Sequence, residues 1–314
     1  MQGRRAVAAG TRDAFHQVRS VRARPTRLSK LKSTSTPYAA MLNLRHLVLE
    51  EHMNTKNPVL TTLAGTGVGT LGGLIGLGGA EFRLPLLIGV FGYSALPAVI
   101  LNKAMSLAVV ASALPFRLSA VPLHQLMAHT NIILTLLTGS LLGAWCGADW
   151  ATKIKAQTLY RVLSMLLVVI AFVLLFGHNA TAKSTPLFTG WPLAVIGAVA
   201  GFGIGIVASL MGVAGGELLI PTIVMLFGAD IKLAGSLSLA VSLPTMLVGF
   251  TRYSRDQSFS VIRTERRFVV FMVAGSLLGS FIGSRLLGII PAGILLPLLA
   301  VILLVSAVKV WKHT

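Results

Sequence analysis

Long stretches without a charged side chain set the first constraint on how this chain can fold. Beyond residue 58, seven stretches contain no Asp, Glu, Lys or Arg. Each reaches or nearly reaches the roughly 20 residues that an α-helix needs to cross the hydrocarbon core of a bilayer. The stretches are 59–80, 131–148, 162–182, 184–216, 233–251, 268–284 and 286–308. An eighth apolar stretch, 95–116, is interrupted only by Lys103.

Composition agrees with a membrane location. Hydrophobic residues make up 54% of the 314 residues and charged residues only 11%, well below the roughly 25% of an ordinary soluble domain. Two further apolar segments, 82–92 and 218–229, are too short to span alone. No segment alternates with a period of two, as the strands of a membrane barrel would. The sequence therefore predicts an all-α polytopic membrane protein with eight long helices and two half-length helices.

The net charge of +18 is uneven along the chain. Residues 1–58 hold 11 of the 27 Lys and Arg residues and 3 of the 9 acids. This basic tail has no apolar core of a secretory signal. Three interpretations stay open: a mitochondrial presequence, a translated upstream region before a true start at Met53, or a basic tail on anionic lipid. No aromatic platform or binding motif accompanies the arginines, so nucleic acid is not an expected partner.

A fixed offset in residue number relates the two halves of the apolar region. Gly76-Leu77-Gly78-Gly79-Ala80-Glu81 matches Gly212-Val213-Ala214-Gly215-Gly216-Glu217, and at the same offset Pro85 matches Pro221. Gly139-Ser140-Leu141-Leu142-Gly143 likewise matches Gly275-Ser276-Leu277-Leu278-Gly279. We interpret the offset as a duplication, with repeat A at 59–180 and repeat B at 190–312, as is common in secondary transporters.

The relative orientation of the repeats depends on how the half-length segments are counted. If each makes a crossing, a repeat has five crossings and the repeats are inverted. If each folds with its neighbour into one broken span, a repeat has four and the repeats are parallel. Both arrangements place the two termini and the basic loop from Arg252 to Arg267 on one side of the membrane, which is the cytoplasmic side by the positive-inside rule. With inverted repeats, Lys153 and Lys155 would also be cytoplasmic. With parallel repeats, Arg117 and Lys183 would be cytoplasmic instead. We favour the inverted arrangement.

The matched glycine clusters predict two broken helices. Clustered glycines permit the positive-φ turns that end a helix, and the following proline suits the start of a new one. The new half-helix would direct free N–H groups and a positive dipole end into the protein, where an anion can bind. Two such ends would meet near the bilayer midplane. Glycines spaced by four, 139/143/147 and 275/279/283, are instead expected to let helices pack closely.

These twin breaks, in a duplicated chain of this size, resemble the sulfite exporter (TauE/SafE) family, also called toluenesulfonate uptake permeases. The resemblance covers residues 59–311. It implies a transporter of sulfur-containing anions or organosulfonates in a bacterial inner membrane, with the motif glycines near the substrate path and a homodimer as the assembly. Ala80 and Glu81-Phe82-Arg83 depart from the family pattern, in which glycine and apolar residues are common at these places.

Polar residues inside the apolar stretches are the candidates for the site. A charge at the position of Lys103 costs at least about 2.5–3.5 kcal/mol and should face the protein interior. Lys103 would bind an oxygen of an anionic substrate. Alternatively, it would extend to the membrane interface or pair with Glu81. Glu81 and Glu217 are candidates for proton coupling, or for simple dipole partners of their helices. Arg83 either pairs with Glu81 or lies on the anion path.

The remaining candidates are matched between the repeats. Two pairs of positions are polar in both repeats: Ser106 with Ser242, and Asn102 with Ser238. These side chains would donate hydrogen bonds to an oxyanion. Alternatively, the serines would donate to backbone carbonyls of their own helix. The full substrate-binding set is Gly76, Gly78, Gly79, Asn102, Lys103, Ser106, Gly212, Gly215, Gly216, Ser238 and Ser242. No catalytic residue, metal ligand or cofactor is expected, since no histidine lies in a long span and Cys146 is the only cysteine.

Three functions compete at this point. The first is a secondary transporter of a small sulfur-containing anion, with the lipid bilayer and that anion as partners. The second is an intramembrane enzyme, which would need a nucleophile with a base, or a metal set, in the spans. The third is a non-transporting scaffold or receptor subunit, which would not need two matched broken helices. The sequence favours the transporter.

Overall fold

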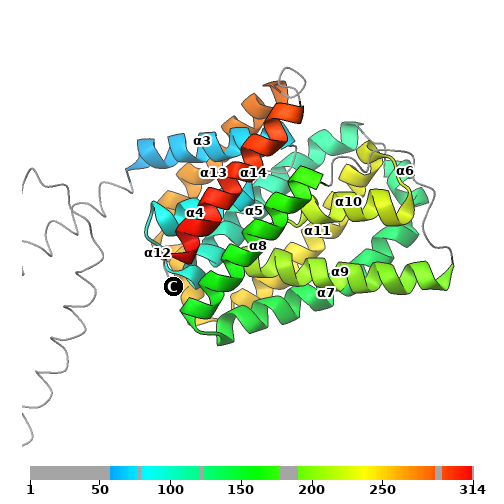
Figure 1. Cartoon of the computed structure of the whole chain (residues 1–314), viewed down its shortest axis with the longest axis horizontal. Coiled ribbons are helices and arrows are strands. Elements are labelled where there is room, and N and C mark those ends of the chain that lie inside the picture. Colours follow the sequence, from blue (N-terminus) through cyan, green and yellow to red (C-terminus); the bar gives the residue numbers. More distant parts are fainter. Residues whose placement is uncertain (1–56, 76–78, 121–122, 177–189, 287–291, 313–314) are drawn as a thin grey trace, which may run out of the picture. The chain divides into compact units, whose positions relative to one another are not determined.

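The computed structural model describes residues 57–75, 79–120, 123–176, 190–286 and 292–312 (Figure 1). Within these ranges the chain is helical and contains no strand. The basic tail and its three interpretations lie outside them. An all-helical fold is the expected outcome for apolar segments that must satisfy their backbone hydrogen bonds internally.

The long helices of the described ranges are eight in number. They are α3 (Pro58–Ile75), α5 (Ala95–Ala120), α7 (Thr130–Lys153), α8 (Ala156–Phe176), α9 (Trp191–Met211), α11 (Ile231–Tyr253), α13 (Arg266–Leu286) and α14 (Ala292–Trp311). Six of these, α5, α7, α8, α9, α11 and α13, contain windows long and apolar enough to cross a membrane. Short helical pieces connect them: α6 (Leu123–Ala128), η3 (Gln257–Phe259) and α12 (Ser260–Thr264).

The two half-helices are α4 (Ala80–Gly89) and α10 (Gly216–Phe227). Their 10 and 12 residues extend only about 15 and 18 Å at 1.5 Å per residue. Gly79 precedes α4 with φ 72° and Gly215 precedes α10 with φ 79°. L-residues rarely adopt this left-handed conformation, so glycine is needed where each half-helix begins.

The prolines lie deeper in the half-helices than a helix-start position. Pro85 is the sixth residue of α4 and Pro221 the sixth of α10. The expectation that they would mark the helix start is therefore wrong by more than one turn. Because proline has no N–H, each one removes the bond to the carbonyl four residues earlier. Those carbonyls belong to Glu81 and Glu217.

Helix boundaries recur at the offset seen in the sequence. The last residues of α3 and α9, Ile75 and Met211, are matched positions at that offset. The same spacing separates the first residues of α4 and α10, of α5 and α11, of α7 and α13, and of α8 and α14. The matched glycines, prolines and apolar runs therefore give matched helices.

Glycine rows hold the closest helix pairs together. α3 packs along α13 and α7 packs along α9. A Cβ at Gly143 would clash with the carbonyl of Phe202, and one at Gly279 with the carbonyl of Thr66. The prediction that 139/143/147 and 275/279/283 serve close packing is confirmed, because a Cβ at each of these six glycines would meet backbone of the facing helix. The other main contacts join α8 to α14 and α7 to α11.

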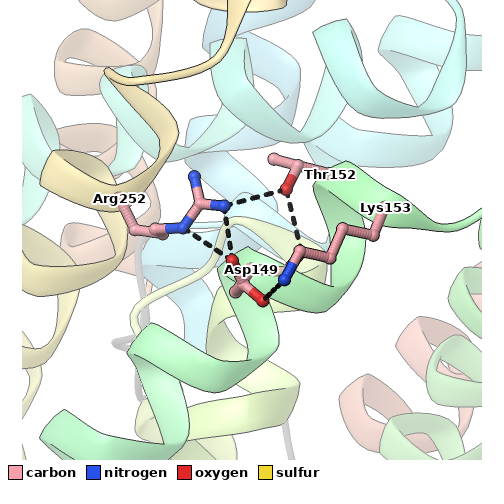
Figure 2. Close-up of polar contacts among 4 residues, drawn as sticks. All are labelled: Asp149, Thr152, Lys153 and Arg252. Carbon is pink, nitrogen blue, oxygen red and sulfur yellow. Dashed lines mark hydrogen bonds and ion pairs between the residues drawn. The ribbon is translucent and has the colours of Figure 1, made fainter.

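The C-terminal ends of α7 and α11 are joined by an ionic cluster (Figure 2). Asp149 on α7 accepts hydrogen bonds from Nε and Nη2 of Arg252, the Nε bond at 3.0 Å, and it also pairs with Lys153. Arg252 also reaches Oγ1 of Thr152 at 3.4 Å. Just beyond the end of α11, the guanidinium of Arg255 lies 5.1 Å from the ring centroid of Trp145. Residues 153 and 252 therefore lie at the same end of the bundle.

The link between α4 and α5 contacts residues near the starts of α8 and α13. The ring centroids of Phe91 and Phe268 are 4.8 Å apart, and the amide of Ala95 donates to the Tyr160 hydroxyl at 3.1 Å. Tyr93, in the same link, lies against Glu265; burial and the nearby carboxyl raise the pKa of its phenol, which keeps it protonated. The α4–α5 link thus lies beside the residues that precede α13.

Candidate functional site

Asn102 lies between the two helix breaks. Its Nδ2 donates to the carbonyl of Ala80, the first residue of α4, at 2.9 Å, and to the carbonyl of Met211, the last residue of α9, at 3.0 Å. Gly212, which caps α9, fits so closely against α5 that a Cβ there would clash with the carbonyl of Val99. A single fully buried amide therefore bonds to both breaks, and its Oδ1 has no hydrogen-bond partner in the described part of the chain.

Lys103 follows directly and is wholly buried. Its ammonium donates to the carbonyl of Ala208 on α9 at 3.1 Å. Among the described residues no carboxylate forms an ion pair with its Nζ. The predicted pair with Glu81 is therefore not formed, and the side chain does not snorkel to an interface. A buried ammonium that donates to one carbonyl can donate to further acceptor atoms, such as the oxygens of an anion.

Ser209, Gly249 and Tyr253 complete the surroundings of Lys103, and the sequence did not single them out. Ser209 is fully buried, and its hydroxyl has no hydrogen-bond partner among the residues that the structure describes. A Cβ at Gly249 would lie 2.8 Å from Ser209 Oγ and 3.1 Å from Lys103 Nζ, so both polar groups converge on this glycine. The hydroxyl of Tyr253 donates to the carbonyl of Ser209 at 3.0 Å. Neither Ser209 nor Gly249 has an identical partner at the repeat offset, so the repeat comparison could not reveal them.

Arg83 is the second buried cation and joins three helices. Its Nη1 donates to Ser106 Oγ on α5 and its Nη2 to Ser276 Oγ on α13, both at 3.3 Å. The guanidinium is also attracted by the Glu81 carboxyl on its own helix. This attraction is not a hydrogen-bonded pair, because neither oxygen of Glu81 has a hydrogen-bond partner among the described residues. The two expectations for Arg83, a pair with Glu81 or a place on the anion path, stay predictions. Ser106 accepts from Arg83, and its expected role as an oxyanion donor stays a prediction.

Glu81 and Glu217 lie in the first turns of the two half-helices and face each other. Glu81 is 0% exposed and Glu217 is 5% exposed. Their carboxyl groups interact with each other across the two breaks. Within the ranges that the structure describes, both oxygens of Glu81 and Oε2 of Glu217 lack a hydrogen-bond donor. Two carboxyl groups that meet without a donor between them provide a place for a proton or a small cation.

The other predicted site residues lie at the breaks or on α11. Gly76 and Gly78 lie outside the described residues. Gly79 and Gly215 precede the two half-helices, Gly212 caps α9, and Gly216 is the first residue of α10. Ser238 donates to the carbonyl of Gly235 at 2.9 Å, within its own helix. Ser242 is 1% exposed, on the same helix. In the described part of the chain, no group of three or more His, Cys, Asp or Glu residues could hold a metal ion.

Comparison with known proteins gives the family. The model of the family described as sulfite exporter TauE/SafE matches residues 63–310 and, in a second match, residues 34–174. No curated protein and no solved structure matches the chain. The longer match includes both breaks, both glutamates and Lys103, and the six apolar helices agree with a multi-pass membrane transporter. The chain therefore belongs to the TauE/SafE sulfite exporter family.

Proposed function

We propose that this protein is a secondary transporter that moves a small sulfur-containing anion, such as sulfite or an organosulfonate, across the membrane by alternating access. The family supports the class of substrate. The proposed binding site lies around Lys103, next to the two helix breaks. It requires no catalytic residue and no cofactor, and the protein acts as a carrier and not as an enzyme.

The observation that carries this proposal is the buried ammonium of Lys103. A charged lysine at this depth costs at least about 2.5–3.5 kcal/mol when it is left without a partner. Here it has one carbonyl partner, at 3.1 Å, and no carboxylate partner in the described part of the chain. A bound anion would supply the missing charge. Ser209 Oγ, which converges with Nζ on Gly249, would donate to a second oxygen of the anion.

We further propose that the two halves are inverted repeats, each with five crossings. Inverted repeats require the ends of α7 and α11 to lie on the same side, and parallel repeats require them on opposite sides. Lys153 and Arg252 share Asp149, which supports the inverted arrangement (Figure 2). The approach of Gly89 at the end of α4 to Lys309 near the end of α14 supports it as well. Alternating access would then exchange the environments of the two half-helices.

The positive-inside rule assigns this end of the bundle to the cytoplasm. The basic residues near it are Lys153, Lys155, Arg252, Arg255, Arg263, Arg266, Arg267, Lys309 and Lys312. Both termini would then be cytoplasmic, and a bacterial inner membrane is the proposed location. A homodimer is the proposed assembly. Cysteine-accessibility labelling of Ser254→Cys from each side of sealed vesicles tests the orientation.

A non-transporting scaffold is the alternative class, and a carrier of a different small ion is the alternative substrate. A scaffold would gain nothing from a buried cation beside two broken helices. A cation carrier would bind its substrate at Glu81 and Glu217 and would be opposed by Arg83 and Lys103. The test below separates all three.

The full-length protein is reconstituted in liposomes, and uptake of sulfite, sulfate, thiosulfate, methanesulfonate and acetate is measured. Lys103→Gln removes the buried charge. Lys153→Gln is the matched control, because it makes the same chemical change on a side chain that is 67% exposed. The expected result is uptake of at least one sulfur-containing anion, reduced at least tenfold by Lys103→Gln and unchanged by Lys153→Gln.

Two other results would change the conclusion. Uptake that persists in Lys103→Gln would keep the transporter and discard Lys103 as the anion ligand. No uptake of any anion by folded protein, together with uptake of a cation, would replace the anion carrier by a cation carrier. No uptake of either kind would favour the scaffold.

A further inference from the structure

Two acidic side chains meet where the two half-helices begin. Glu81 stands in the first turn of α4 and Glu217 in the first turn of α10. They come from opposite repeats, yet their carboxyl groups interact directly. Asn102 bonds to the carbonyls of Ala80 and Met211 and so connects the two breaks that carry them.

Most oxygens of this pair have no hydrogen-bond donor among the described residues. Three of the four, both of Glu81 and Oε2 of Glu217, are buried without a hydrogen-bond partner there. Two bare carboxylates in contact repel each other, and the low dielectric of the protein interior strengthens that repulsion. A proton on one carboxyl group turns the repulsion into a hydrogen bond between the two. The arrangement is therefore complete only with an added positive charge.

The charged groups around the pair are few. Arg83 lies on α4 and is attracted by Glu81. Lys103 on α5 donates to Ala208, and Lys309 on α14 lies at the opposite end of α4, near Gly89. The described sequences of α3 and α9 contain no charged residue; α8 carries Arg161 and α11 carries Lys232 and Arg252, each near a helix end.

We propose that Glu81 and Glu217 share one transported proton, and that this proton crosses the membrane together with the anion. This inference rests on the proposed function. In each cycle a carboxylate oxygen takes one proton from water on the side to which the site is open. The same O–H bond breaks on the other side, and water there accepts the proton.

Charge balance couples the proton to the anion. The guanidinium of Arg83 is permanently charged, and Lys103 is protonated when it holds an anion. With both glutamates ionised, these four residues are neutral as a set. A shared proton leaves one positive charge, and a monovalent anion restores neutrality. Proton and anion therefore increase each other's affinity, which is reciprocal by linkage, and the transported complex is neutral.

Proton uptake on anion binding tests this directly. Methanesulfonate is the probe, because it keeps a single negative charge over the pH range used, so any proton taken up belongs to the protein. Purified protein in weakly buffered detergent is mixed with methanesulfonate, and a pH indicator reports the protons consumed. The wild type is expected to take up about one proton per bound anion. Glu217→Gln and Glu81→Gln are expected to abolish this uptake, Glu217→Asp to restore part of it, and Glu265→Gln, an acid outside the spans, to leave it unchanged.

A second measurement does not depend on the anion. Infrared difference spectra recorded on acidification should contain a protonated-carboxyl band in the wild type, and this band should be lost in Glu81→Gln and in Glu217→Gln. Anion binding without proton uptake, or absence of this band in folded wild type, would overturn the shared proton. If the band is present but no anion binds, the proton site stands and the proposed function fails. A requirement for Na⁺ instead of protons would replace the proton by a metal cation and overturn the proposal.

Discussion

The two half-helices share their construction but not their charge. α4 and α10 each follow a left-handed glycine, carry glutamate in the first turn and have proline at the sixth residue. Arg83 on α4 corresponds to Leu219 on α10, and Lys103 on α5 corresponds to Leu239 on α11. Both cations are fully buried, and so is the apolar Leu219, at 1% exposure. Both halves therefore build the breaks, but only the first half places buried cations beside them.

This asymmetry has a physical reason. A second pair of buried cations would require further compensation, because each isolated charge in a low-dielectric site is costly. Two glutamates already balance two cations. On the proposed function, one anion site per chain would follow. Substitutions that make one half resemble the other therefore show which features are structural and which are specific to the anion.

The largest effect is expected for Arg83→Leu, which gives α4 the residue found on α10. It leaves Glu81 without its attracting cation and removes the bonds to Ser106 and Ser276. Breaking a buried charged contact of this kind costs about 3–5 kcal/mol. Thermal unfolding in detergent should show a large decrease in the midpoint, with partial recovery in Arg83→Leu/Glu81→Gln. A wild-type midpoint in Arg83→Leu would show that Arg83 is not part of the charge balance.

The packing glycines should behave alike in both halves. A Cβ at Gly69 or at Gly205 would clash with a carbonyl of the facing helix, whereas a Cβ at Gly67 or Gly203 has nothing within 4 Å. Gly69→Ala and Gly205→Ala should each destabilise by about 1–3 kcal/mol through overpacking. Gly67→Ala and Gly203→Ala, matched positions on the same two helices, should leave the unfolding midpoint unchanged or slightly raised. An effect in one repeat alone would contradict the structural equivalence of the halves.

The fold could be predicted from the sequence more fully than the site. Uncharged stretches and the fixed offset between the repeats indicate the long helices, the half-helices and the glycine rows, because these depend on local composition. The partners of Arg83 could not be predicted, since Ser276 lies 193 residues away in sequence. Ser209 and Gly249 were missed for the same reason: nothing local distinguishes a serine that faces a buried lysine from one that bonds its own helix. The pairing of Lys103 with Glu81 was wrong because Lys103 extends toward α9.

A smaller difference is expected between the matched residues Asn102 and Ser238. Asn102 bonds to both breaks, whereas Ser238 bonds within its own helix. Asn102→Ala removes two bonds that contribute about 0.5–1.5 kcal/mol each and leaves two carbonyls without that partner. Ser238→Ala should change the unfolding midpoint little. Equal effects of the two substitutions would show that Asn102 does not hold the breaks together.

The smallest effect is expected at the ionic cluster, which joins the two halves and is not repeated at the matched positions. Asp149 corresponds to Arg285 in repeat B, so the pair with Arg252 has no counterpart. The side chains of Arg252 and Asp149 are 16% and 31% exposed, and partly exposed pairs of this kind contribute little to stability. Asp149→Asn should lower the unfolding midpoint slightly, and less so at high salt. A large decrease that salt does not reduce would assign the cluster a role in the transport cycle.

The stoichiometry of anion binding tests the asymmetry most directly. Sulfite and methanesulfonate are titrated by calorimetry into the purified wild type, Lys103→Gln and Leu239→Gln. The account predicts one binding site per chain, lost in Lys103→Gln and retained in Leu239→Gln, because only repeat A supplies the cation. Two equivalent sites per chain, or binding that survives in Lys103→Gln, would contradict it.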